Sequence, residues 1–150
     1  MSYVVYTDGS CLGNPGAGGW AAVVIERETG EVAEISGGAP HTTNNRMELI
    51  AAIAALRALK VGSKVELFTD SQYLRNAFEK NWLRNWKARG WQTAAKKPVL
   101  NQDLWLELDD LMVSHEVKFN WVRGHDGDHF NERCDQLARG QATKFKSARQ

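Results

Sequence analysis

Apolar and polar positions alternate along the first part of the chain, and the pattern predicts strands before any helix. The β-branched and aromatic runs at residues 3–7, 20–26 and 32–36 each have the composition of a strand. Thr29-Gly30 separates the last two runs, so we expect a hairpin there and an antiparallel meander overall. Residues 9–19 are rich in glycine and are expected to form a turn.

The rest of the chain changes repeatedly between a helical and a strand-like period. Apolar residues recur at helical spacing between residues 45 and 60, where alanines occupy the other faces, so a buried helix is expected. The elements predicted after it are a strand at 65–69, helices at 71–78 and 101–112, a strand at 116–122 and a helix at 131–144. This order predicts an α/β fold, with a five-stranded mixed sheet that joins the meander to parallel strands and has helices against it.

Composition is consistent with one globular domain over residues 1–150. The chain is 43% hydrophobic and 25% charged, and its apolar runs are too short for a membrane span. The start lacks the pattern of a signal peptide, and Cys11 and Cys134 match no disulfide or metal-binding spacing, so a cytoplasmic location is expected. We expect residues 144–150 to form a frayed basic tail and the protein to be a monomer.

The net charge of +1 conceals one strongly polarised segment. Between residues 80 and 97 the chain has no acidic residue and six basic ones, namely Lys80, Arg84, Lys87, Arg89, Lys96 and Lys97. Tryptophans alternate with these cations, as is typical of surfaces that contact nucleic acid. A solvated amphipathic helix with Trp82 and Trp86 in the core would explain the same pattern.

Four acidic residues lie at boundaries of predicted elements: Asp8, Glu48, Asp70 and Asp135. In an α/β fold such boundaries can converge at one edge of the sheet. Carboxylates gathered there would repel one another unless a cation neutralised them, and oxygen ligands favour Mg²⁺ or Mn²⁺. The four residues are therefore candidate metal ligands.

Each of these acids also has an ordinary structural explanation. Asp8 can be a turn residue that accepts hydrogen bonds from nearby backbone, and Asp70 can cap the helix that follows it. Glu48 stands three residues after Asn45, which is the spacing of a capping box. Asp135 precedes an arginine by four residues, so an exposed ion pair on one helix face would account for it.

The sequences around these acids resemble those of bacterial type 1 ribonuclease H. The matching segments are TDGSCLGNPG at 7–16, TTNNRMEL at 42–49, TDSQY at 69–73, GH at 124–125 and NERCD at 131–135. The resemblance extends from about residue 3 to about residue 142 and implies the ribonuclease H-like fold. It implies a metal-dependent endonuclease that cuts the RNA strand of RNA–DNA hybrids and leaves 5′-phosphate and 3′-hydroxyl ends.

The resemblance also assigns catalytic roles. Asp8, Glu48, Asp70 and Asp135 match the family's metal-binding carboxylates, which would hold two Mg²⁺ ions, or Mn²⁺, about 3.5 to 4 Å apart. Glu48 would also lie near the RNA 2′-hydroxyl. His125 matches a loop histidine that moves protons or assists product release, although the loop after it, residues 126–130, departs from the usual family pattern.

The resemblance further implies contacts to the hybrid. The residues at matching positions are Cys11, Asn14, Thr43, Asn44, Asn45, Gln72, Trp82, Lys87, Arg89 and Trp91. The segment at about 80–99 would be the family's basic protrusion, with its cations facing the DNA backbone. The glycines between 9 and 19 fit neither a Walker A nor a Rossmann motif, and they either form a tight turn or let a duplex approach closely.

Three other functions remain open from the sequence. A hybrid-binding module without activity would not need the full carboxylate set. A related 3′–5′ exonuclease would carry an Asp-x-Glu pair on the first strand, where this chain has Asp8-Gly9-Ser10. A DNA resolvase would leave the basic, Trp-rich segment unexplained. Removal of RNA primers and R-loops is the cellular role that the resemblance implies.

Overall fold

Five strands form one mixed sheet in the order β3-β2-β1-β4-β5 in the computed structural model, which describes residues 1–122 and 129–148. The strands are β1 (Ser2–Leu12), β2 (Gly16–Glu26), β3 (Val32–Thr42), β4 (Lys64–Thr69) and β5 (Glu116–Trp121). β2 runs antiparallel to both β1 and β3, whereas β4 runs parallel to both β1 and β5. The predicted meander and mixed sheet are confirmed.

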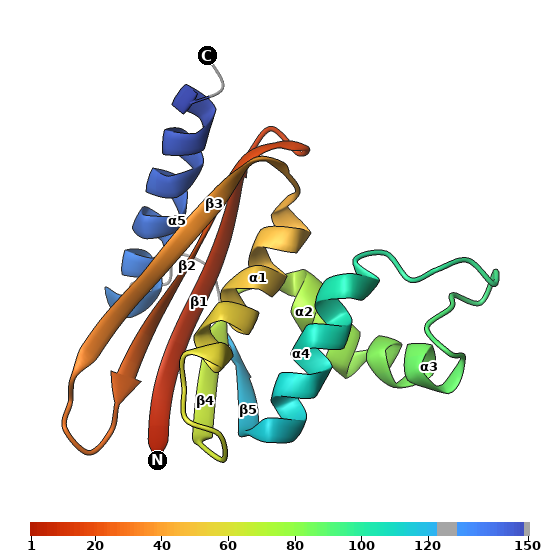
Figure 1. Cartoon of the computed structure of the whole chain (residues 1–150), viewed down its shortest axis with the longest axis horizontal. Helices are drawn as coiled ribbons and strands as arrows, with labels where there is room; N and C mark the ends of the chain where they lie inside the picture. Colours follow the sequence, from red (N-terminus) through yellow and green to blue (C-terminus); the bar gives the residue numbers. More distant parts are fainter. Residues whose placement is uncertain (123–128, 149–150) are drawn as a thin grey trace.

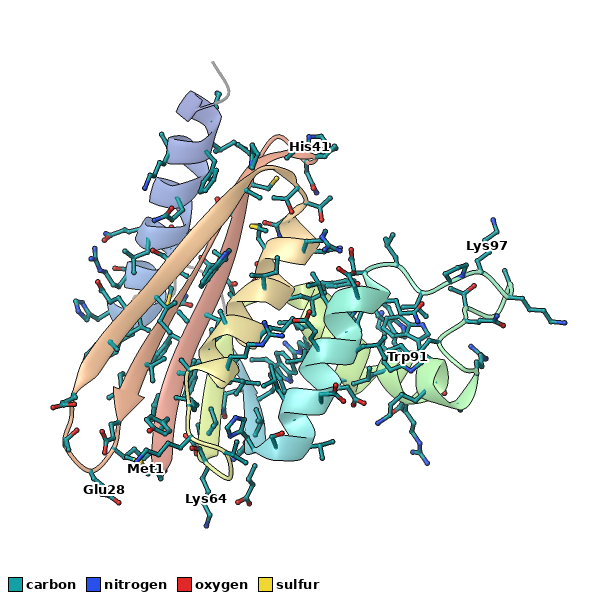
Figure 2. The ribbon with its side chains drawn as sticks, in the orientation of Figure 1. Met1, Glu28, His41, Lys64, Trp91 and Lys97 are labelled. Atoms are coloured by element: carbon teal, nitrogen blue, oxygen red, sulfur yellow. The ribbon has the colours of Figure 1, made fainter. Side chains whose placement is uncertain are left out.

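Helices cover both faces of this sheet (Figure 1). They are α1 (Asn44–Arg57), α2 (Gln72–Glu79), α3 (Trp82–Ala88), α4 (Gln102–Ser114) and α5 (His129–Ala148). α5 packs on β1, β2 and β3 from one side, and α1 packs on β1 and β2 from the other, with α4 against α1. α3 and the loop after it project away from the sheet, and Lys97 extends into solvent near the far end of that loop (Figures 1 and 2).

The glycine-rich segment is mostly strand, which corrects the turn predicted for residues 9–19. β1 continues to Leu12 and β2 begins at Gly16, so that only a short turn separates them. Cross-strand pairing overrides the weak strand propensity of glycine here, because both strands are also held by helices on their faces. The hairpin at Thr29-Gly30 is present, and Gly30 has the positive φ that such a turn requires.

The helix limits differ from the expected ones mainly at the C-terminal end. α5 continues to Ala148, so most of the segment predicted as a frayed tail is helical. Phe145 explains part of this, because its ring lies against Gly38 of β3 and gives the last turns a contact with the sheet. Among the described residues, no helix is long and apolar enough to cross a lipid bilayer.

Small residues set the spacing between the helices and the sheet. A Cβ atom on Gly9 of β1 would lie 2.6 Å from the backbone nitrogen of Glu48 in α1. On the next strand, a Cβ on Gly19 would lie 2.6 Å from the backbone nitrogen of Ala142 in α5. The space beside these glycines is therefore occupied by the protein's own helices. At Gly9 and Gly19 the missing side chain thus makes room for a helix and not for a duplex.

We predict that Gly9→Ala destabilises the fold by about 2 kcal/mol or more, because the added methyl would push α1 away from β1. Gly140→Ala is a matched control, since Gly140 lies in α5 with no atom near its missing side chain. The control is expected to raise stability by about 0.5–1 kcal/mol. Urea unfolding monitored by circular dichroism measures both changes, and equal stabilities for the two variants would contradict the close approach.

Candidate active site

Asp8 and Asp70 lie side by side because Asp8 is in β1 and Asp70 directly follows β4, the parallel neighbour of β1. Tyr6 of β1 is aligned with Phe68 of β4, so two residues further on Asp8 and Asp70 reach the same edge. β4 ends at Thr69, whereas β1 continues alongside β2. The sheet is therefore open beside Asp8, and both carboxylates lie at that opening.

Glu48 joins this pair from α1. Asp8, Glu48 and Asp70 each offer an oxygen, and these oxygens all lie within 4.8 Å of one another. We call these three residues the carboxylate cluster. Asp8 and Glu48 are each only 5% exposed. The close packing of α1 on Gly9 brings the Glu48 side chain down to this depth.

Burial and mutual repulsion raise the pKa values of two of these acids. Burial has the largest effect on Asp8, followed by the negative charges of Asp70 and Asp135, and together they raise its pKa to about 8. The same causes, burial first and then Asp8 and Asp70, raise the pKa of Glu48 well above its ordinary value. The backbone N–H of Gly9 donates to Asp8 at 2.9 Å and offsets only part of this cost.

Asp135 of α5 lies at the same opening but has a second partner. It lines the pocket that contains the carboxylate cluster, and a side-chain hydrogen bond between it and Asp8 favours the protonated form of Asp8. Its Oδ2 also accepts from Nη2 of Arg139 at 2.9 Å. The ion pair expected from the helical spacing is thus present, yet it does not remove Asp135 from the pocket.

The donor set fits a hard divalent cation. Oε2 of Glu48 is buried with no hydrogen-bond partner in the described structure, which is costly for an ionised carboxylate. A cation bound by Asp8, Glu48 and Asp70 would satisfy that oxygen and relieve their repulsion. Because every donor is a carboxylate oxygen, the site suits Mg²⁺ or Mn²⁺ better than Zn²⁺.

The capping explanations for two of the acids are wrong. Thr43 is the N-cap of α1, and its side chain accepts from the backbone N–H of Arg46, so no capping box forms between Asn45 and Glu48. Ser71 caps α2 by accepting from the backbone N–H of Leu74. Asp70 is thus not the cap that the sequence allowed.

The polar residues predicted to contact the hybrid fall into two groups. Asn44, Asn45 and Gln72 line the pocket with the carboxylates. Cys11 and Asn14 instead make contacts within the protein. The Cys11 thiol lies 3.0 Å from the Gly13 carbonyl oxygen, and Asn14 Oδ1 accepts from the backbone N–H of Asn44. These contacts hold the β1–β2 turn beside the start of α1.

The basic protrusion, residues 80–99, is anchored by its tryptophans. Trp82, Trp86 and Trp91 are half-buried and pack against the core, as expected for the first two. Lys87 is not directed freely to solvent, because its Nζ donates to Oδ1 of Asp109 in α4 at 3.1 Å. Arg89 is exposed at the end of α3.

His125 and Tyr73 differ from the residues above in how the structure bears on them. His125 lies outside the described residues, so its predicted role is not addressed by this geometry. Tyr73 was assigned no role, although it belongs to the TDSQY segment and lines the carboxylate pocket. Its position in the sequence could have indicated this, because Tyr73 lies three residues after Asp70, in the first turn of α2.

Comparisons with known proteins agree with this geometry. A profile of the RNase H family matches residues 1–143. A ribonuclease H from Nitratidesulfovibrio vulgaris (strain DP4) is 60% identical over 140 residues, which cover 93% of this chain and 88% of that protein. The solved structure of LC9-RNase H1, a type 1 RNase H with the type 2 active-site motif, has a TM-score of 0.82 and 34% identity, over 95% of this chain and 72% of that one. LC11-RNase H1 in complex with RNA/DNA hybrid has a TM-score of 0.72 at 23% identity, over 95% and 97% of the two chains, and so shows the fold.

The raised pKa of Asp8 predicts how stability depends on pH when no cation is bound. The folded protein holds the Asp8 proton more tightly than the unfolded chain, so lowering the pH from about 8 to about 4 should favour the folded state. Asp8→Asn removes the repulsion at high pH. We expect the variant in EDTA to be more stable than wild type at alkaline pH by on the order of a few kcal/mol, with a difference that shrinks towards pH 5.

The measurement is thermal unfolding of both proteins across this pH range. Asp110→Asn provides a control, because Asp110 is an exposed acid on α4 away from the cluster. The control should keep the pH dependence of the wild type. An Asp8→Asn protein no more stable than wild type at alkaline pH would show that the carboxylates do not repel one another as described.

Proposed function

The chain belongs to the RNase H family of endoribonucleases, and from this premise we propose that it hydrolyses the RNA strand of RNA–DNA hybrids at internal positions. The observation that carries the proposal is the carboxylate cluster, with its three oxygens within 4.8 Å of one another. Binding of a hybrid needs no such cluster. Burial of the carboxylates costs free energy, and the cluster is useful only if it holds cations. A binding module without activity is therefore the weaker candidate.

Asp8, Glu48, Asp70 and Asp135 would hold two Mg²⁺ ions, with Mn²⁺ as a substitute. When bound, such ions supply positive charge, activate a water molecule and stabilise the leaving oxygen. The chain itself provides the negative charge that binds them, and Gly9 provides the close contact that positions Glu48. Products with 5′-phosphate and 3′-hydroxyl ends follow from cleavage of the bond to the 3′ oxygen.

The neighbouring polar residues would select the substrate. Asn44, Asn45 and Gln72 line the pocket and offer amide donors and acceptors, which suit base edges and 2′-hydroxyl groups. Glu48 lies among them and would also be close to a 2′-hydroxyl. Thr43, Cys11 and Asn14 are proposed to contact the hybrid as well, and Asn14 already accepts one N–H at the start of α1. His125 is proposed to move protons or to assist product release.

The protrusion would bind the DNA strand through its cations. Arg89 is exposed, and Lys87 can exchange Asp109 for a phosphate at little cost, because exposed ion pairs contribute only about 0–1 kcal/mol. Trp82 and Trp91 would position these cations by packing on the core. The hybrid-bound structure of LC11-RNase H1 supports a nucleic-acid ligand for this fold.

We further propose a monomer in the cytoplasm that removes RNA primers and R-loops. Cys11 and Cys134 are both free thiols, as a reducing compartment would keep them. The Cys134 thiol is buried, and burial raises its pKa to about 12, so it is protonated and unreactive.

The test of the function is cleavage of one 5′-labelled RNA presented as hybrid, as duplex RNA and as single strand, in Mg²⁺. We expect internal cuts in the hybrid alone, and loss of at least about 100-fold in rate for Asp8→Asn, because the site would lose a ligand charge. Asp110→Asn is the control and should cut at the wild-type rate. Hybrid binding without cleavage in either Mg²⁺ or Mn²⁺ would overturn the proposal in favour of a binding module.

A second prediction concerns the protrusion. Lys87→Ala combined with Arg89→Ala should raise KM for the hybrid by about three- to ten-fold and change kcat little, because phosphate contacts of this kind bind ground state and transition state alike. Lys144→Ala combined with Lys146→Ala removes equal charge from α5 and is expected to have a smaller effect. Steady-state kinetics at low salt measures both, and a loss confined to kcat would exclude a binding role for Lys87 and Arg89.

A further inference from the structure

Tyr73 connects the carboxylate pocket to the base of the protrusion. It lies in the first turn of α2, three residues after Asp70, and its side chain lines the pocket. The Tyr73 hydroxyl accepts two hydrogen bonds, from Nε1 of Trp105 at 2.9 Å and from Nδ2 of Asn101 at 3.2 Å. Trp105 is fully buried in α4, so its indole N–H depends on this acceptor.

Both ends of the protrusion rest on the same two side chains. At the outgoing end, Trp82 of α3 packs on the Tyr73 ring with centroids 6.5 Å apart. Trp86 packs edge-on against Trp105 at 5.5 Å. At the returning end, Asn101 donates to the Tyr73 hydroxyl. The two segments that lead into and out of the protrusion therefore share one support.

The returning end is held in an unusual backbone conformation. Asn101 has a φ of 62° and precedes α4 as its N-cap, yet its side chain makes no capping hydrogen bond. Among the described residues, all four non-glycine residues with positive φ lie between Asn81 and Asn101. Backbone of this kind persists where surrounding contacts fix it, and the Asn101 side chain is used for such contacts.

Arg46 of α1 fixes Asn101 from the other side. Its Nη1 donates to Asn101 Oδ1 at 3.3 Å, and its guanidinium makes two further hydrogen bonds to Asp103, at 3.0 and 2.8 Å. The side-chain hydrogen bonds from Arg46 hold the pKa of Asp103 below its ordinary value. Arg46 lies two residues before Glu48, so this contact joins the protrusion to the helix that supplies a cluster carboxylate.

We propose that Tyr73 is a positioning residue that fixes the protrusion at one distance and orientation from the carboxylate cluster. The inference rests on the proposed function, because it concerns a hybrid that is held at both places. A substrate that contacts only the pocket gains nothing from this alignment. A longer substrate is bound in register for cutting only if the two sites keep a fixed separation.

The proposal is tested with Tyr73→Phe and two hybrids of different length. The short hybrid is trimmed on the protrusion side until Lys96→Ala combined with Lys97→Ala no longer alters its KM. We expect Tyr73→Phe to raise KM for the long hybrid by about three- to ten-fold with kcat within about two-fold of wild type. KM for the short hybrid should stay at the wild-type value.

Two further variants control for loss of stability. Tyr3→Phe removes a hydroxyl of the same kind at the start of β1, where it donates to Met1 Sδ. This variant should leave KM unchanged for both hybrids. Arg46→Lys keeps the charge but lacks the planar fork that holds Asn101 and Asp103, so it should reproduce the length-dependent rise in KM. It also leaves the Trp105 N–H satisfied by Tyr73.

The outcomes separate this inference from the proposed function. A rise in KM limited to the long hybrid, seen in both Tyr73→Phe and Arg46→Lys, supports a positioning role. Equal losses on both hybrids, or no change on either, overturn it while the function stands. A wild-type protein that cuts neither hybrid overturns the function and this inference together.

Discussion

Repulsion among buried carboxylates is the constraint on which the rest of this structure depends. Asp8 and Glu48 are almost fully buried beside Asp70, and oxygens of the three residues lie within 4.8 Å of one another. A fold gains no stability from such an arrangement, so the scaffold must impose it, and a bound cation would relieve it. Asp135 differs, because it forms an ion pair with Arg139.

The scaffold imposes the cluster through backbone geometry more than through local side-chain contacts. Parallel alignment of β1 and β4 puts Asp8 beside Asp70, and the early end of β4 opens the sheet there. α1 reaches the same place because Gly9 has no side chain to hold it off. Tyr73 lies in the first turn of α2, where it lines the carboxylate pocket and accepts a hydrogen bond from Trp105. One edge of the sheet thus carries the carboxylate cluster and a residue that contacts the base of the protrusion.

Much of this could be predicted from the sequence, for physical reasons that differ between elements. The hairpin, the helix over Asn44–Arg57 and the parallel strands have strong periodic patterns, so their types were predictable. The strand limits near Gly9 and Gly19 could not be predicted, because glycine has weak strand propensity. These residues are held in β1 and β2 by the pairing of the two strands with each other, which a local pattern does not encode. The roles of Thr43, Ser71 and Tyr73 depend on which neighbour each side chain reaches, which periodicity does not encode.

The measurement that tests this account most directly is the number of protons released when Mg²⁺ binds near neutral pH. Titration calorimetry in buffers of different ionisation enthalpy gives this number. Burial raises the pKa of Asp8 to about 8 and that of Glu48 well above its ordinary value, so Mg²⁺ binding should release about one proton or more, and Asp8→Asn should release fewer protons than the wild type. Mg²⁺ binding by the wild type without net proton release would contradict the claim that repulsion in the cluster is relieved by the cation.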